Sequence, residues 1–196
     1  MSRFLSARFA ALEAYTPGEQ PQDMEYVKLN TNESPFPPSP EVIAAVSAAE
    51  VGKLNLYPDP ECKRLRRKLA ALYGVGEENV FLPNGSDDIL NFFFMAFCDA
   101  ERPVAFPNIS YGFYPVYAQL YNLPATVIPL REDFSLNAED YCGLHQNIVI
   151  ANPNAPTGMT IPVSDIETIV QTNPDHVVLI DEAYVDFGAG GCRGLI

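Results

Sequence analysis

HVVLIDEAY, residues 176–184, predicts the fold of this chain more directly than any other segment. The apolar run 176–180 has the character of a buried strand. Asp181 follows at its carboxyl end, with the phenol of Tyr184 three positions on. Open α/β sheets present their ligand-binding groups at the carboxyl ends of their strands. We therefore expect Asp181 and Tyr184 to face a ligand.

The segments upstream of this stretch alternate between short apolar runs and amphipathic runs. We predict strands at 79–82, 103–106, 126–130, 147–151 and 177–180, and helices at 86–98, 112–120 and 163–171. Strands that are continuous Val/Ile/Leu runs and alternate with helices are typical of a largely parallel sheet with helices on both faces. The predicted fold class is α/β.

The N-terminal third has a different character. Apolar residues at helical spacing in 3–15 predict a helical arm, which the Pro/Gly-rich stretch 16–22 ends. Two further helices are predicted from a cap followed by proline, at 39–50 and 59–73. In the second, Leu65, Leu69 and Leu72 should face inward, and a basic run should face water, made of Lys63, Arg64, Arg66, Arg67 and Lys68.

Composition excludes several classes of protein. With 47% hydrophobic residues in 196 positions, the chain can bury a sizeable core. Its net charge of −13 argues against nucleic acid or an anionic membrane as the main partner. No apolar run approaches the roughly 20 residues that span a bilayer, and the first residues lack the pattern of a signal peptide. The four cysteines are widely separated and form no metal-binding pattern, so we expect a cytoplasmic protein with inert thiols and no metal.

Residues 83–88, PNGSDD, lie between a predicted strand and a predicted helix. Gly85 permits a tight turn, and the free backbone N–H groups at the helix start would form an anion site suited to a phosphate. The alternative is an ordinary helix cap, with acidic residues favouring the first turn.

Two further loops follow predicted strands. Tyr111 comes after 103–106 and could stack on a planar heteroaromatic ring, although simple core packing explains it equally well. The segment NPNAPTG at 152–158 follows 147–151. Its prolines restrain the backbone and an asparagine amide could donate to a phenolate-like oxygen, while a turn without a ligand is the alternative.

Asp181 completes the set. Opposite a pyridine nitrogen, a buried carboxylate would hold that nitrogen protonated through a charge-assisted hydrogen bond, and the ring would then act as an electron sink. A structural aspartate at a strand end is the alternative.

The segments GSDD, SYG, NPNAPTG and DEAY, in this order and spacing, resemble the fold-type I pyridoxal-phosphate aminotransferases. LNTNESP at 29–35, YPDP at 57–60 and DEAYVDF at 181–187 narrow the resemblance to the histidinol-phosphate aminotransferases. The resemblance implies the PLP-dependent transferase fold and transfer of an amino group between histidinol phosphate and 2-oxoglutarate in histidine biosynthesis. It also implies a homodimer. We expect residues 1–35 to form an arm and the start of a small domain, and 36–196 an incomplete large cofactor-binding domain.

The resemblance also implies roles for individual residues. It places the phosphate of pyridoxal 5'-phosphate at Gly85, Ser86 and Asp87, and the cofactor ring against Tyr111. Asp181 pairs with the pyridine nitrogen, and Tyr184 and Asn154 contact the 3'-oxygen; Asp181 and Tyr184 are the expected catalytic residues. Tyr57 reaches the cofactor of the neighbouring subunit. Asn32 and Glu33 lie near the substrate.

The sequence departs from the family pattern at two points. Many relatives have asparagine directly before Pro-Thr-Gly, where this chain has Ala155, so the amide role is assigned to Asn154. The Schiff-base lysine, the second phosphate-binding serine and arginine, and the substrate-binding arginines of the family have no counterpart in residues 1–196. We therefore expect no turnover from this fragment. Alternatives are threonine-phosphate decarboxylase, an aromatic aminotransferase, or a non-catalytic module that needs a partner chain.

Overall fold

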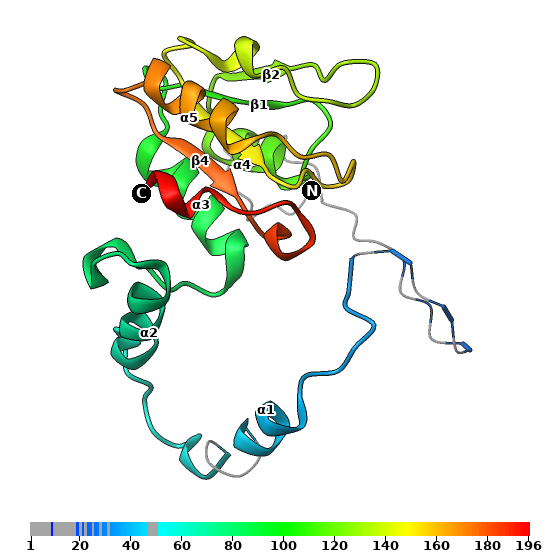
Figure 1. Cartoon of the computed structure of the whole chain (residues 1–196), viewed down its shortest axis with the longest axis vertical. Coiled ribbons are helices and arrows are strands. Elements are labelled where there is room, and N and C mark those ends of the chain that lie inside the picture. Colours follow the sequence, from blue (N-terminus) through cyan, green and yellow to red (C-terminus); the bar gives the residue numbers. More distant parts are fainter. Residues whose placement is uncertain are drawn as a thin grey trace.

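A parallel sheet forms the centre of the computed structural model, which describes residues 9, 19, 21, 23–24, 26–27, 29–30, 32–46 and 51–196 (Figure 1). Four strands lie in the order β2-β1-β3-β4, and all neighbouring pairs are parallel. Their bounds are β1 Val104–Pro107, β2 Ala125–Ile128, β3 Asn147–Ala151 and β4 Val178–Asp181. The predictions of a parallel sheet and of these four strands are confirmed, to within two residues at each end.

Helices cover both faces of this sheet (Figure 1). The helices are α1 Pro40–Ala45, α2 Lys63–Tyr73, α3 Gly85–Phe97, α4 Phe113–Tyr121 and α5 Val163–Thr172. Short 3-10 helices are η3 Val51–Lys53, η4 Glu77–Asn79, η5 Ala138–Tyr141, η6 Val185–Phe187 and η7 Cys192–Leu195. The helices predicted at 86–98, 112–120 and 163–171 are confirmed as α3, α4 and α5.

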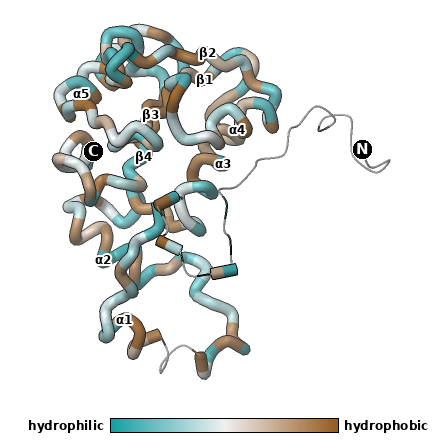
Figure 2. The backbone as a smooth tube through the Cα atoms, turned by 90° about the vertical axis from the view of Figure 1, so that its right-hand side faces the viewer, coloured by the Kyte–Doolittle hydropathy of each residue, from teal (hydrophilic) through white to brown (hydrophobic). Residues whose placement is uncertain are grey.

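Alternation along the strands divides the core into two halves. One half joins Val104, Phe106 and Val149 to side chains of α3 and α4, whereas the other joins Ala105, Ile148 and Ile150 to Ile169 of α5. Because both faces of the central strands are covered, the strands are continuously apolar rather than alternating. Figure 2 shows this hydrophobic character in the strands.

The order of the strands creates a switch point. The chain passes from β1 through α4 to β2 on one side, then returns to place β3 on the other side of β1. In open α/β sheets, ligands bind in the crevice at the carboxyl ends of the strands beside such a reversal. A ligand site in this sheet is therefore expected among the segments that follow β1, β3 and β4.

The strand predicted at 79–82 was wrong. Residues 77–79 form η4, and Val80, Phe81 and Leu82 pair with no strand among the described residues. Phe81 is mostly exposed, and its ring centroid lies 6.0 Å from that of Phe92 on α3. An apolar run alone does not make a strand without a neighbour that satisfies its backbone.

The helices predicted before residue 74 are shorter than expected. Ser39 caps α1 as predicted, accepting a hydrogen bond from the N–H of Val42 at 3.4 Å. The predicted continuation through 47–50 and the predicted arm at 3–15, apart from residue 9, lie outside the described residues. The predicted cap of α2 at Asp59 was wrong, because α2 begins at Lys63 and its N-cap is Cys62. Asp59 instead accepts from the N–H groups of Glu61 and Lys63 in the turn before the helix.

The inward face predicted for α2 was wrong for two of its three leucines. Leu65 is 51% exposed and Leu72 is 65% exposed, while Leu69 is half-buried and Ala70 is buried. These two leucines are exposed because α2 stands away from the sheet (Figure 1). Among the described elements, α2 packs chiefly against η4. A helix can be amphipathic without a described neighbour on its apolar face.

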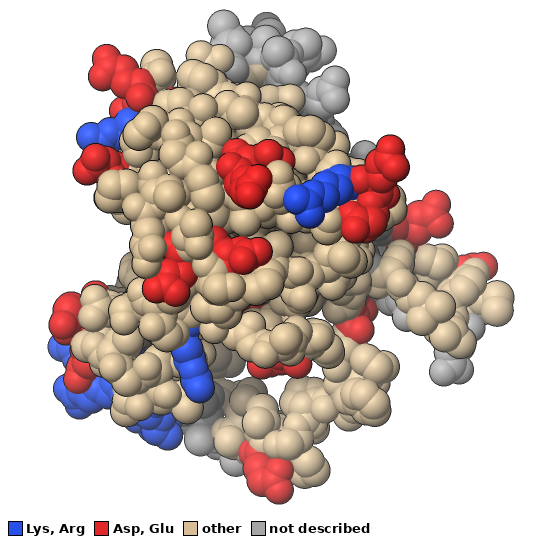
Figure 3. Space-filling model, turned by 45° about the horizontal axis from the view of Figure 1, so that its top comes forward, with Lys and Arg blue, Asp and Glu red and all other residues tan. Residues whose placement is uncertain are grey.

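Charges lie on the surface as the composition suggests. Figure 3 shows acidic side chains scattered over one face and Lys and Arg gathered mainly at one corner. Most of the basic run of α2 is exposed as predicted, whereas Arg66 is half-buried and donates to the carbonyl of Glu77 at 2.6 Å. Arg67 forms an ion pair with the carboxylate of Glu77 at 3.4 Å.

The four cysteines are all free thiols, with Cys98 buried and Cys62 exposed. Burial raises the pKa of the Cys98 thiol to about 11. Among the described residues, no group of three or more His, Cys, Asp or Glu side chains could hold a metal ion. In the same part of the chain, every helix is too short or too polar to cross a membrane.

Replacement of Phe94 tests the packed half of the core between α3, α4 and the sheet. Phe94 is 0% exposed and contacts the ring of Tyr117 at 5.4 Å between centroids. We expect Phe94→Ala to lower the free energy of unfolding by about 3–5 kcal/mol, because it removes buried apolar surface and leaves a cavity. Urea unfolding followed by circular dichroism measures this change. Leu72→Ala on exposed α2 is the control and should cost less than about 1 kcal/mol; an equal cost would show that α2 has a packed partner.

Candidate functional site

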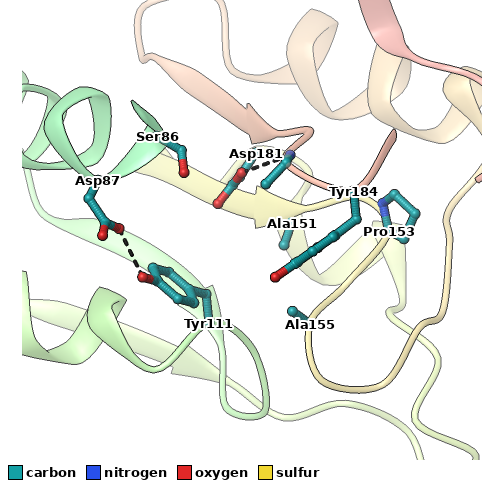
Figure 4. Close-up of a pocket in the computed structure, with 9 residues that line it drawn as sticks. Ser86, Asp87, Tyr111, Ala151, Pro153, Ala155, Asp181 and Tyr184 are labelled. Carbon is teal, nitrogen blue, oxygen red and sulfur yellow. Dashed lines mark hydrogen bonds between the residues drawn. The ribbon is translucent and has the colours of Figure 1, made fainter. Parts of the chain in front are cut away.

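A pocket lies at the carboxyl ends of β3 and β4, beside the start of α3 (Figure 4). Its cavity volume is about 120 Å³, which is smaller than a typical small-molecule site of roughly 300–1,000 Å³. The lining residues come from four separate segments: Ser86, Asp87, Tyr111, Ala151, Pro153, Ala155, Asp181, Ala183 and Tyr184. The structure thus brings together five of the predicted site residues.

Asp181 is the last residue of β4, where it pairs with Ala151 of β3. Its Oδ1 accepts a hydrogen bond from the N–H of Ala183 at 3.1 Å, and its Oδ2 accepts from the hydroxyl of Tyr114 at 3.1 Å. A carboxylate offers about four acceptor positions, so these two bonds leave capacity for a further donor. The side chain points into the pocket (Figure 4).

Tyr114, in the first turn of α4, is fully buried behind Asp181. Desolvation raises the pKa of its phenol well above the usual value, and the charge of Asp181 raises this pKa further. The hydroxyl therefore stays protonated and remains a donor to the carboxylate. Tyr114 was not among the residues selected from the sequence, although its position three residues after Tyr111 places both near the start of one helix.

The start of α3 forms the second side of the pocket. Gly85 has a positive φ of 79°, which favours glycine, and the space that a Cβ would occupy is open. Gly85 begins the helix, so the N–H groups of Ser86 and Asp87 lie in the first turn and lack intrahelical acceptors. A phosphate site at these groups stays a prediction.

Tyr111 forms a wall of the pocket. Its hydroxyl donates to Oδ1 of Asp87 at 2.8 Å, which ties it to the start of α3. Its ring stacks on Phe113 with centroids 5.6 Å apart and meets Tyr114 edge-on at 5.8 Å. Tyr111 therefore both packs against the core and presents its ring to the pocket.

Tyr184 reaches the pocket from the loop after β4 (Figure 4). Its hydroxyl accepts a hydrogen bond from Nδ2 of Asn32 at 3.1 Å, so its own hydrogen is available to an acceptor in the pocket. Asn32 and Glu33 line an adjoining cavity together with Tyr184 and Phe187. Both residues predicted to lie near the substrate are thus beside the main pocket.

Asn154 lines the cavity beside the pocket, and its amide is hydrogen-bonded to neighbouring loops. Its Nδ2 donates to the carbonyl of Ile109 at 3.0 Å and to Oγ1 of Thr157 at 2.9 Å, and its Oδ1 accepts from Ser110 at 2.7 Å. The amide therefore joins the loops after β1 and β3, and Ala155 lines the pocket in its place. A contact between Asn154 and a cofactor stays a prediction.

Tyr57 is fully exposed and is not among the residues that line the pocket. Its predicted contact with a neighbouring subunit stays a prediction, as does the predicted division of the chain at residue 35.

The model of the family "Aminotransferase class I and II" matches residues 24–195. A histidinol-phosphate aminotransferase of Clostridium acetobutylicum is 52% identical over 188 residues, which is 96% of this chain and 53% of the relative. One of a Marinomonas species is 50% identical over 197 residues, covering 100% of this chain and 56% of the relative. The chain spans about half the length of the curated relatives it matches.

A solved structure is similar to this chain in fold. The histidinol-phosphate aminotransferase from Sinorhizobium meliloti in complex with pyridoxal-5'-phosphate matches with a TM-score of 0.73 and 26% identity. The match covers 79% of this chain and 43% of that chain.

Replacement of Asn154 tests its role between the two loops. We expect Asn154→Ala to lower the free energy of unfolding by about 2–3 kcal/mol, because partly buried partners on both loops lose their hydrogen bonds. Thermal or urea unfolding measures this change. The control is Asn91→Ala, since the side chain of Asn91 accepts one hydrogen bond, from Tyr121 at 2.7 Å. A smaller cost for Asn154 than for Asn91 would contradict the bridging role.

Proposed function

We propose a function for this chain from its family, because the chain belongs to the class I and II aminotransferases and is a homologue of histidinol-phosphate aminotransferases. The proposal is that the pocket binds pyridoxal 5'-phosphate. The observation that carries it is the convergence of a carboxylate, an aromatic ring, a phenol and a helix start around one space. Each of these groups matches a different part of that cofactor.

The helix start suits the phosphate, since the N–H groups of Ser86 and Asp87 supply donors and the dipole attracts negative charge. Tyr111 offers a ring face for stacking, with its hydroxyl held by Asp87. Tyr184 would donate to the 3'-oxygen, because its hydroxyl accepts from Asn32 and keeps its own hydrogen. Asp181 retains acceptor capacity for a protonated pyridine nitrogen.

The chemistry that pyridoxal 5'-phosphate supplies when bound is the withdrawal of electrons from the Cα of an amino acid. The part played by Asp181 is to keep the pyridine nitrogen protonated, which maintains that withdrawal. Tyr184 would hold the cofactor through the 3'-oxygen, and Tyr111 would offer its ring face to the pyridine ring. These roles make Asp181 and Tyr184 the catalytic residues of this part of the protein.

We propose histidinol phosphate and 2-oxoglutarate as the substrates of the complete enzyme, in histidine biosynthesis. Identity near 50% to histidinol-phosphate aminotransferases supports this choice over related activities. The cavity beside Asn32, Glu33 and Phe187 supplies room for a substrate next to the cofactor. We further propose a cytoplasmic homodimer, in which the exposed Tyr57 reaches the cofactor of the neighbouring subunit, and a division into an arm at 1–35 and a large domain from 36.

Turnover requires a lysine, and none of the described residues supplies one to the pocket. Lys53, Lys63 and Lys68 do not line it, and Lys28 lies outside the described residues. We propose that residues outside 1–196 supply the lysine and the arginines that complete the site, and that residues 1–196 alone do not turn over.

Replacement of Asp181 tests the cofactor site directly. Pyridoxamine 5'-phosphate needs no covalent bond to lysine, so it can be titrated into this chain by isothermal titration calorimetry. We expect Asp181→Asn to weaken its binding by about 10–100-fold, because a neutral amide loses the charge-assisted hydrogen bond to the pyridinium.

The control for this experiment is Asp175→Asn, which removes an exposed carboxylate just before the opposite end of β4. It should leave the affinity unchanged. Equal affinities of Asp181→Asn and the unaltered chain would overturn the assignment of Asp181 to the pyridine nitrogen.

Borohydride reduction tests the proposal about the lysine. We expect the chain mixed with pyridoxal 5'-phosphate and reduced to show no single preferred lysine by peptide mass spectrometry, because no described lysine faces the pocket. Surface lysines should react weakly and without selectivity. Stoichiometric labelling of one lysine within residues 1–196 would contradict the proposal that the Schiff-base lysine lies elsewhere.

A further inference from the structure

Asp181 is held by a buried side chain that belongs neither to its own strand nor to the lining of the pocket. Tyr114 donates to Oδ2 of Asp181 at 3.1 Å, across 67 residues of sequence. The other oxygen, Oδ1, accepts the N–H of Ala183 at 3.1 Å. One bond on each oxygen fixes the plane of the carboxylate, because rotation about the Cβ–Cγ bond would break both.

The Tyr114 ring is itself fixed by packing. It is 0% exposed, and its centroid lies 6.0 Å from that of Phe106 of β1 and 5.8 Å from that of Tyr111, in a T-shaped contact. A buried phenol that cannot reorient is a precise donor, since its rotamer is set by the surrounding core. The same ring thus touches both the predicted stacking residue and the predicted nitrogen-binding residue.

We infer that Tyr114 is a positioning residue for the cofactor, which orients the Asp181 carboxylate toward the pyridine nitrogen through its buried hydroxyl. This inference rests on the proposed function, because it concerns the same site. It predicts two effects of removing the hydroxyl. First, the Asp181 carboxylate becomes free to rotate. Second, the carboxylate becomes more basic without this donor, so the proton between Asp181 and the pyridine nitrogen would shift toward Asp181.

The test is Tyr114→Phe, which removes one oxygen and keeps the ring. We expect the affinity for pyridoxamine 5'-phosphate to fall roughly 10-fold, as for loss of one hydrogen bond to a charged group. We also expect the ¹⁵N chemical shift of the bound, labelled pyridine nitrogen to move toward that of the neutral ring. A merely structural role would not move this shift.

The matched control is Tyr141→Phe. Tyr141 is buried as deeply as Tyr114, but it lies in the other half of the core and its hydroxyl has no hydrogen-bond partner among the described residues. It should leave both affinity and nitrogen shift unchanged. In the Asp181→Asn background, Tyr114→Phe should add little, because its effect passes through Asp181.

A second pair of variants keeps the test decisive if Tyr114→Phe does not fold. Tyr114 is replaced by 4-aminophenylalanine, which retains a donor, or by 4-methylphenylalanine, which has similar size and no donor. The inference predicts that the first retains the nitrogen shift and the second loses it.

Several outcomes separate the two claims. The proposed function stands if the unaltered chain binds pyridoxamine 5'-phosphate and Asp181→Asn weakens this binding. The inference is overturned, in that case, if Tyr114→Phe matches the unaltered chain in affinity and nitrogen shift. If the unaltered chain does not bind this ligand, the cofactor site itself is overturned, and the inference with it.

Discussion

The parallel register between β3 and β4 is the constraint on which the site depends. Ile148, Val149, Ile150 and Ala151 pair in order with Val178, Leu179, Ile180 and Asp181, and the N–H of Asn152 continues the ladder to the carbonyl of Asp181 at 3.0 Å. A slip of one residue would exchange the two faces of the strand, because the side-chain period is two. Asp181 would then leave the pocket, and Leu179 would leave the core beneath α3 and α4.

Buried amides hold the ends of the strands in this register. Asn147 donates to the carbonyl of Phe97 at 2.6 Å and accepts from the N–H of Val177 at 2.9 Å, so it joins the end of α3 to the start of β4. Asn152 exchanges two hydrogen bonds with the backbone of Ile161 at the other end of β3. Buried polar groups that are fully paired specify one arrangement of the chain, since any other arrangement leaves them unsatisfied.

The start of α3 combines acidic side chains with free backbone N–H groups. The chain carries a net charge of −13, and acidic residues 87 and 88 lie in the first turn of α3. Asp87 accepts from Tyr111 and Asp88 accepts from the N–H of Asn84 at 3.0 Å, so hydrogen bonds fix both side chains. The first N–H groups of a helix have no intrahelical acceptor, so they stay available beside these carboxylates.

The sequence by itself determined the alternation of strands and helices, the parallel sheet and the family, because continuous apolar runs and loop motifs are local patterns. It also identified Asp181, Tyr111, Tyr184 and the start of α3 as neighbours, since the carboxyl ends of parallel strands meet at one edge. Only the tertiary structure decided which side chains hold these groups. The bond between Tyr114 and Asp181, the engagement of Asn154 by two loops, and the exposure of Leu65 and Leu72 depend on contacts between distant segments, which periodicity and spacing do not specify.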